Sequence, residues 1–192
     1  MIFSQNDEQL VIERWTPHAG KFLDIGAWHA KQLSNTRALY EKGWTGVMVE
    51  PSPGPMRALV EEYGGDPAIE LVSAAVGPER GLLQMHVTDL PVSTGDASVR
   101  EVWATEGGYI GRLWVPVWTV EDLINQFGPF NFVSIDAEGG SVDIFRRVVT
   151  NPMHPECICV EHDSKTQECL QIAQDAGYNR YHMTSENLVF AR

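Results

Sequence analysis

The chain has 192 residues, of which 43% are hydrophobic and 21% are charged, and this composition excludes a disordered, collagen-like or coiled-coil protein. Its length suits one domain that buries enough surface to fold without disulfides or a structural metal. With 14 Lys and Arg against 26 Asp and Glu, the net charge of −12 disfavours nucleic acid as the main partner, because a phosphate backbone would be repelled.

Short apolar runs alternate with stretches of helical period in the first part of the chain. Residues 21–25 form a short, mostly apolar run that is followed by Gly26, as is typical of a buried parallel strand. Ser34 is placed to cap a helix over 35–42, which Gly43 ends. The same alternation predicts a strand at 47–50, a helix at 56–63 and a strand at 69–76.

The stretch 80–118 interrupts this alternation. Strands are predicted at 82–87 and 113–118, and the segment between them is rich in Ser, Thr and Gly. Long irregular segments inside compact domains are often lids or binding loops, although a surface excursion without function fits the same pattern. We therefore treat 80–118 as a candidate lid or substrate-binding region.

Regular alternation resumes near the C-terminus. It predicts helices at 120–127, 141–149 and 166–176, strands at 132–135 and 157–160, and a closing hairpin of strands at 178–183 and 188–191. Strands that alternate with helices predict a mostly parallel sheet, to which the hairpin adds an antiparallel edge. We find no repeat or linker, so we expect one α/β domain over residues 1–192.

Cellular location is indicated by apolar runs and cysteines. No apolar run approaches the ~20 residues of a membrane-spanning helix, and the first residues lack the pattern of a secretion signal. Cys157 and Cys159 alternate within an apolar run and would share one face of a strand, as small buried thiols do. With Cys169 they form no disulfide framework, so we expect a cytoplasmic protein with no membrane partner.

Acidic residues end the first two predicted strands, where ligands of such sheets bind. Asp24 precedes Gly26, which permits a tight turn, and Glu50 follows the second strand. A carboxylate at that position can accept hydrogen bonds from two ribose hydroxyls, although a solvated strand-end acid is the alternative. The GxGxxG phosphate motif is absent after Gly26, which favours a nucleoside cofactor without phosphates, such as S-adenosylmethionine, over NAD or FAD.

Several short motifs follow one another in a characteristic order. They are SQ (4–5), FLDIGA (22–27), SNT (34–36), GWTG (43–46), VEP (49–51), AAVG (74–77), VWTVEDL (117–123) and VSIDAEG (133–139). In their order and spacing the chain resembles the FkbM-type methyltransferases over nearly its whole length. The resemblance implies a Rossmann-like class I methyltransferase fold, S-adenosylmethionine as cofactor, and O-methylation of a hydroxyl on a sugar or small metabolite.

The resemblance also implies positions for the cofactor. Its methionine part would contact Asp24, Gly26 and Ala27, and its ribose would bind Glu50. The adenine would lie near Ser73 or Ala74, and Asp136 would face the reacting methyl. The remaining implied cofactor contacts are Asn35 and Pro51.

Methyl transfer to an alcohol requires aligned reactants and removal of a proton. Asp136, Glu138 and His162 are the candidate catalytic residues, because they follow neighbouring central strands. His162 is the natural base in the absence of a metal, since histidine titrates near neutrality; a histidine with a purely structural hydrogen bond is the alternative. Glu138 could instead interact with the positive end of the helix that begins near 141.

A metal site is a further hypothesis. Asp136, Glu161 and His162 offer oxygen ligands and one imidazole at the ends of adjacent strands, and catechol-type O-methyltransferases hold Mg²⁺ with acids at comparable positions. A Mg²⁺ or Mn²⁺ ion would bind the acceptor oxygen and lower its pKa.

Two other functions fit the same residues: a nucleoside-binding module that has lost catalysis, and a nucleotide-dependent oxidoreductase. The acceptor is expected to be a small molecule or carbohydrate. Aromatic side chains around 80–118 could stack on a sugar ring or belong to the core; these are Trp103, Tyr109, Trp114 and Trp118.

Overall fold

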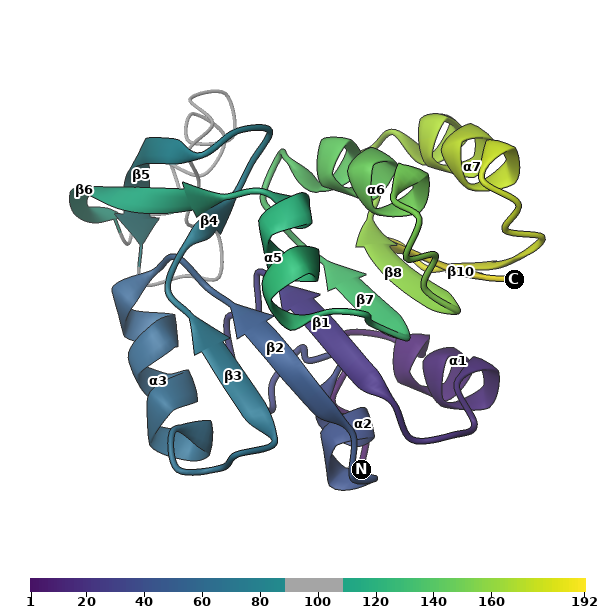
Figure 1. The fold of residues 1–192 in the computed structure, drawn as a ribbon, viewed down its shortest axis with the longest axis horizontal. Helices are drawn as coiled ribbons and strands as arrows, with labels where there is room; N and C mark the ends of the chain where they lie inside the picture. Colours follow the sequence, from purple (N-terminus) through teal and green to yellow (C-terminus); the bar gives the residue numbers. More distant parts are fainter. Residues whose placement is uncertain (89–108) are drawn as a thin grey trace.

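The computed structural model describes residues 1–88 and 109–192 and contains two sheets and six helices in that part of the chain (Figure 1). The main sheet consists of β1 (Lys21–Ile25), β2 (Thr45–Val49), β3 (Ile69–Val72), β7 (Phe132–Ile135), β8 (Cys157–Glu161), β9 (Arg180–Met183) and β10 (Asn187–Ala191). The smaller sheet consists of β4 (Ala75–Val76), β5 (Gly81–Thr88) and β6 (Tyr109–Trp118). The helices are α1 (Glu8–Trp15), α2 (Arg37–Glu41), α3 (Pro53–Tyr63), α5 (Val120–Phe127), α6 (Ser141–Thr150) and α7 (Thr166–Asp175).

The main sheet has the strand order β3-β2-β1-β7-β8-β10-β9. Its first five strands pair in parallel, and β10 pairs antiparallel with both β8 and β9. The predicted α/β fold with a mostly parallel sheet and a closing antiparallel hairpin is therefore confirmed.

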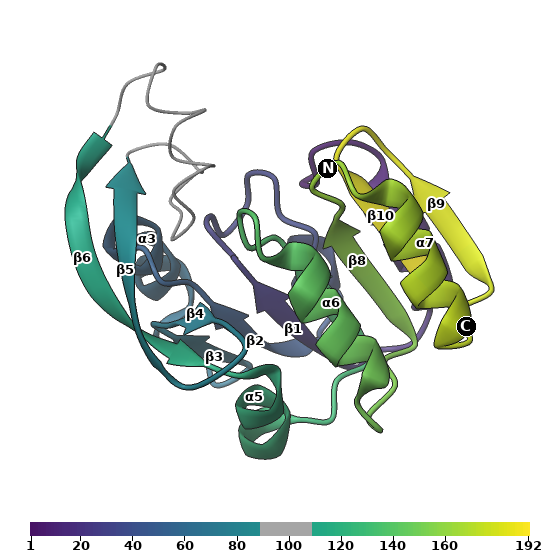
Figure 2. The same cartoon turned by 90° about the horizontal axis from the view of Figure 1, so that it is seen from above.

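Helices cover both faces of the main sheet, so its central strands are buried on both sides. One core joins α5, α6 and α7 to the sheet, and the other joins α1, α2 and α3 to the opposite face (Figure 2). Alternate residues of β8 point into different cores: Cys157 and Cys159 lie in one, Ile158 and Val160 in the other. The three cysteines are buried and free, as predicted.

Several boundaries differ from the sequence prediction. Helix α3 begins at Pro53 rather than at 56, because a proline in the first turn lacks only an N–H that would have no helical partner. Helix α2 is shorter than the predicted 35–42 and has Thr36, not Ser34, as its N-cap, although Ser34 Oγ accepts a hydrogen bond from the Arg37 N–H at 3.1 Å. The predicted strand 69–76 is divided into β3 and β4, because β4 leaves the main sheet to pair with β6.

Helix α1 was not predicted, because its buried face is largely polar and includes Glu8 and Gln9. The Glu8 carboxylate accepts hydrogen bonds from Asn6 N (2.8 Å), Thr184 Oγ1 (2.8 Å) and Asn187 Nδ2 (3.1 Å). Burial raises the pKa of Glu8, but these hydrogen bonds outweigh burial and leave the pKa below its usual value. Glu8 therefore holds the N-terminal segment against the turn between β9 and β10.

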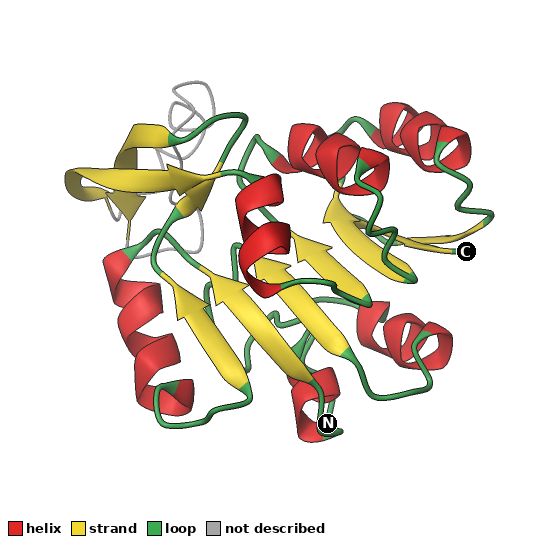
Figure 3. Ribbon diagram, viewed as in Figure 1, coloured by secondary structure: helices red, strands yellow, loops and turns green. Residues whose placement is uncertain are grey.

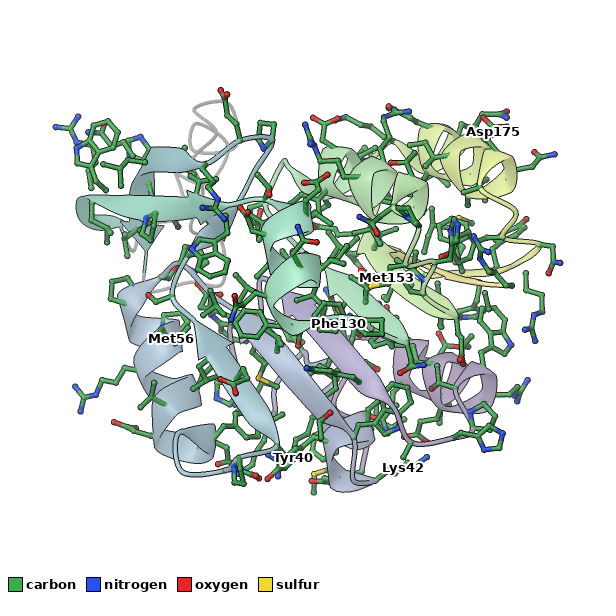
Figure 4. The ribbon with its side chains drawn as sticks, in the orientation of Figure 1. Tyr40, Lys42, Met56, Phe130, Met153 and Asp175 are labelled. Atoms are coloured by element: carbon green, nitrogen blue, oxygen red, sulfur yellow. The ribbon has the colours of Figure 1, made fainter. Side chains whose placement is uncertain are left out.

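The parallel strands all point toward the same edge of the sheet (Figure 3). The opposite edge is filled by side chains such as Phe130 and Met153 (Figure 4), and the Phe130 N–H donates to Met153 Sδ at 3.1 Å. The β5–β6 hairpin lies on the α3 side of the molecule (Figures 1 and 2). Among the described helices, none has the length and apolar character that crossing a membrane requires.

Candidate functional site

A cleft of about 400 Å³ lies at the carboxyl ends of β1, β2 and β7. The smaller sheet contributes Val76, Leu83 and Met85 to one wall, and the N-terminal segment contributes Gln5. Nine of the residues predicted for the site line this cleft: Asp24, Gly26, Ala27, Asn35, Glu50, Pro51, Ala74, Asp136 and Glu138. Three others, Ser73, Glu161 and His162, are not among its lining residues.

Gly26 joins the three strand ends at the floor of the cleft. Its φ of +79° is a left-handed conformation that side chains disfavour. Its N–H donates to Val49 O at 2.9 Å, and the Asp136 N–H donates to Ile25 O at 2.9 Å. A Cβ atom on Gly26 would lie 1.7 Å from Asp136 O, so only glycine allows β1 and β7 to end this close together.

Glu50 connects two loops that border the cleft. Its Oε2 accepts a hydrogen bond from Trp28 N at 3.0 Å, and its Oε1 accepts one from Ser52 N at 2.7 Å. The residue is 5% exposed, and burial raises its pKa despite these hydrogen bonds. Because a carboxylate has about four acceptor positions, Glu50 can still accept hydrogen bonds from ligand hydroxyls.

Asp24 is a second buried carboxylate at the cleft. Its Oδ2 accepts a hydrogen bond from Thr36 Oγ1 at 2.5 Å. Burial raises the pKa of Asp24 to about 6; the Thr36 hydrogen bond opposes this shift, and the charges of Asp136 and Glu50 add to it. At neutral pH Asp24 is therefore ionised but poorly solvated.

The loop after β7 brings further acids to the cleft. Asp136 is exposed in the cleft, yet the protein around it raises the pKa of its carboxyl, and the interaction with Glu161 lowers it. Burial also raises the pKa of Glu138 to about 7, with the charges of Asp136 and Asp163 adding to the shift.

His162 does not line the cleft. Its Nδ1 accepts a hydrogen bond from Ser164 N at 3.2 Å, so its Nε2 carries the proton and donates to Ser185 O at 3.0 Å. The ring is therefore fixed between the loop after β8 and the β9–β10 turn. The structure does not bring the predicted metal set of Asp136, Glu161 and His162 together, and within residues 1–88 and 109–192 no group of three or more His, Cys, Asp or Glu is placed to hold a metal.

The aromatic residues predicted around 80–118 have different surroundings. Trp118 stacks on Phe127 with ring centroids 6.3 Å apart and packs against the core. Trp114 is 62% exposed, on the face of β6 opposite to the one that packs with Met85 of β5. Trp103 and the side chain of Tyr109 lie outside the described residues.

Sequence reasoning missed some of the residues that line the cleft. Asn187 lies on the closing hairpin and reaches the cleft because β10 inserts beside β8. Leu83 and Met85 alternate along β5. This alternation indicates that the two side chains share a face of the strand, but not which part of the protein that face meets. The other lining residues that were not predicted include Gln5, Leu33, Ser52 and Ser134.

The charge of the cleft is one-sided. Its described lining includes the carboxylates of Asp24, Glu50, Asp136 and Glu138 but no Lys, Arg or His. Poorly solvated carboxylates attract a cation strongly and repel an anion. The cleft is therefore suited to a ligand that carries positive charge and hydroxyl donors, and it is unsuited to a pyrophosphate.

Comparison with known families gives one assignment. Residues 24–180 match the family described as "Methyltransferase FkbM domain". No match was found among the curated proteins.

Solved structures with the same fold are methyltransferases of low sequence identity. Precorrin-6y C5,15-methyltransferase from Geobacter metallireducens superimposes with a TM-score of 0.53 and 12% identity, over 96% of this chain and 86% of that one. The Podospora anserina methyltransferase PaMTH1, solved with S-adenosylhomocysteine, gives a TM-score of 0.51 and 9% identity, over 96% and 75% of the two chains. For 1,6-didemethyltoxoflavin-N1-methyltransferase from Burkholderia thailandensis the values are 0.50 and 10%, over 96% and 75%. These likenesses establish the class I methyltransferase fold.

The geometry at Gly26 predicts the effect of a single methyl group. Gly26→Ala places a Cβ inside the van der Waals radius of Asp136 O and should lower the free energy of unfolding by at least about 3 kcal/mol. Gly43→Ala is the matched control, because Gly43 has a similar φ of +84° but nothing within 4 Å of its Cβ position, so it should cost only about 1–2 kcal/mol. Chemical denaturation measures both, and equal losses would contradict the proposed close approach at Gly26.

Proposed function

The chain belongs to the FkbM methyltransferase family, and from this premise we propose that it transfers a methyl group from S-adenosylmethionine to a hydroxyl of a sugar or small metabolite. The observation that carries the proposal is the acidic cleft at the carboxyl edge of the sheet. S-adenosylmethionine has a cationic sulfonium, a cationic ammonium, one carboxylate and two ribose hydroxyls, so its net charge is positive. The two cations and the hydroxyls are complementary to the carboxylates that line the cleft.

We assign the cofactor contacts by charge and position. Glu50 ends β2 and keeps free acceptor positions, which suits it to the ribose hydroxyls. Asp24 is a buried acid near the β1 turn and would attract the ammonium group of the methionine part. Ala74 lies between β3 and β4 and lines the cleft, where its small side chain leaves room for the adenine.

Glu138 is our candidate for the general base. When bound, S-adenosylmethionine supplies an electrophilic methyl carbon, to which the acceptor oxygen bonds while the carbon–sulfur bond breaks and its electron pair stays on sulfur. The acceptor proton then passes to the Glu138 carboxylate, which is effective because the pKa of this residue is raised to about 7. Asp136, beside it at the end of β7, would hold the acceptor hydroxyl in line with the methyl.

The fold does not determine which kind of atom is methylated, so the hydroxyl acceptor is itself part of the proposal. Two of the structurally similar proteins are named as an N1-methyltransferase and a C5,15-methyltransferase. In this chain the acids near the loop after β7 favour an acceptor that must lose a proton. They disfavour an acceptor that carries a carboxylate or phosphate near the reacting atom.

An acceptor panel tests this function. We expect labelled methyl from S-adenosylmethionine to appear as a methyl ether on at least one neutral hydroxylated acceptor, with an equal amount of S-adenosylhomocysteine. Amines and phosphorylated analogues of that acceptor are the matched comparison. Product formation on amines alone, or no S-adenosylhomocysteine with any acceptor despite cofactor binding, would contradict the proposal.

Substitution of Glu138 tests its role as base. Glu138→Gln should lower kcat by about 10²- to 10⁴-fold while the Kd for S-adenosylmethionine changes less than about twofold. In the wild type kcat should rise with pH up to about 7 as Glu138 loses its proton, and this rise should disappear in the variant. Asp143→Asn, an exposed acid on α6, is the control. Wild-type turnover in Glu138→Gln would remove the residue from the mechanism.

A further inference from the structure

Two carboxyl groups meet behind the floor of the cleft. Strands β7 and β8 are parallel neighbours, and Ile135 pairs with Val160 in register. The residue after each of these is an acid, Asp136 and Glu161 respectively, and the two carboxyl groups lie close enough to shift each other's pKa. Asp136 lines the cleft, whereas Glu161 does not. Glu161 is thus a supporting group behind a residue of the proposed site.

A hydrogen bond between two carboxyl groups requires a proton on one of them, because two carboxylates in contact cannot both be ionised. The acidic groups that face Glu161 are Asp136 on β7, Glu138 in the loop after β7 and Asp163 in the loop after β8. Across the pair with β10, the residue in register is the neutral Asn187. Nothing among these neighbours stabilises a negative charge on Glu161.

The free oxygen of Glu161 agrees with a neutral group. Its Oε2 is buried and has no hydrogen-bond partner among the described residues. An ionised carboxylate in that position would need donors for both oxygens, whereas a neutral acid needs one acceptor for its O–H and tolerates a bare carbonyl oxygen better. Burial and the neighbouring acids also raise the pKa of Glu161 to about 9.

We propose that Glu161 is a positioning residue that works as a neutral carboxylic acid, donating its O–H to Asp136 so that Asp136 stays ionised and fixed toward the cleft. This inference rests on the proposed function for its effect on catalysis, but the protonation of Glu161 is a property of the protein alone. An ionised Glu161 would repel Asp136 and would weaken its hold on a hydroxyl acceptor.

Infrared difference spectroscopy tests the protonation without any substrate. At pH 8, above the pKa of Asp24 and Glu138 and below that of Glu161, the wild type should show the carbonyl band of buried protonated carboxyls, and this band should be weaker in E161Q. The exposed acid Glu70 on β3 provides the control variant E70Q, which should keep the band. An E161Q protein whose band is as strong as that of the wild type, or a wild type without a band, would overturn the proposal even if methyl transfer is confirmed.

Kinetics tests the positioning role. Glutamine mimics a neutral acid because its amide can donate to Asp136, whereas leucine cannot. We expect E161Q to keep a kcat at least about tenfold above that of Glu161→Leu, a difference of about 1.4 kcal/mol, while both variants bind S-adenosylmethionine. The wild type should lose activity as the pH rises through about 9, where Glu161 ionises, and E161Q should not.

Three results would overturn this role. Glu161→Asp more active than E161Q would show that an ionisable acid is required. Loss of activity in the wild type after chelation, together with an inactive E161Q, would indicate a divalent cation between the two acids in place of a proton. Equal kcat in all variants would show that Asp136 needs no support. Thermal unfolding of each variant identifies any that fail to fold, in which case the infrared result decides.

Discussion

The main constraint on this structure is that it holds several carboxylates close together at one cleft, two of them with little access to water. Asp24, Glu50 and Asp136 lie at the ends of three neighbouring parallel strands. Asp24 and Glu50 are buried, Asp136 is exposed in the cleft, and the surrounding protein raises the pKa of each. No described basic side chain lines the cleft to neutralise them. Hydroxyl and backbone donors hold two of them in place: Thr36 for Asp24, and the N–H groups of Trp28 and Ser52 for Glu50. Such an arrangement costs stability in the free protein, and a cationic ligand offsets that cost.

The rest of the fold brings these acids to one edge. Parallel strands place their carboxyl ends together, and Gly26 allows β1 and β7 to end in contact. Glu8 performs a similar task at the other side of the cleft, because its hydrogen bonds tie the N-terminal segment to the β9–β10 turn. Gln5 and Asn187 thereby become part of the same cleft wall. A few buried polar contacts thus bring residues that lie far apart in the sequence into one cleft.

The sequence was sufficient for the features that depend on local pattern. Acids at the ends of apolar runs identified Asp24, Glu50 and Asp136, and all three line the cleft. The sequence was insufficient where contacts with a distant segment decide how a side chain is oriented. His162 follows β8 like a catalytic base, but its ring is held by the Ser185 carbonyl on the β9–β10 turn, and no pattern near His162 reports that contact. Likewise, Glu161 was predicted as a metal ligand, whereas it lies outside the cleft and interacts with Asp136, which lines it.

The most direct test of the account is the pH dependence of cofactor binding, measured by calorimetry between pH 5 and 8. The pKa of Asp24 is raised to about 6 in the free protein, and a bound cation favours the ionised form. S-adenosylmethionine should therefore bind more tightly as the pH rises through this range, by about tenfold if the cation lowers that pKa by about one unit. Asp24→Asn should abolish this dependence. A wild-type Kd that does not change with pH, or an unchanged dependence in Asp24→Asn, would contradict the claim that buried carboxylates select the cofactor.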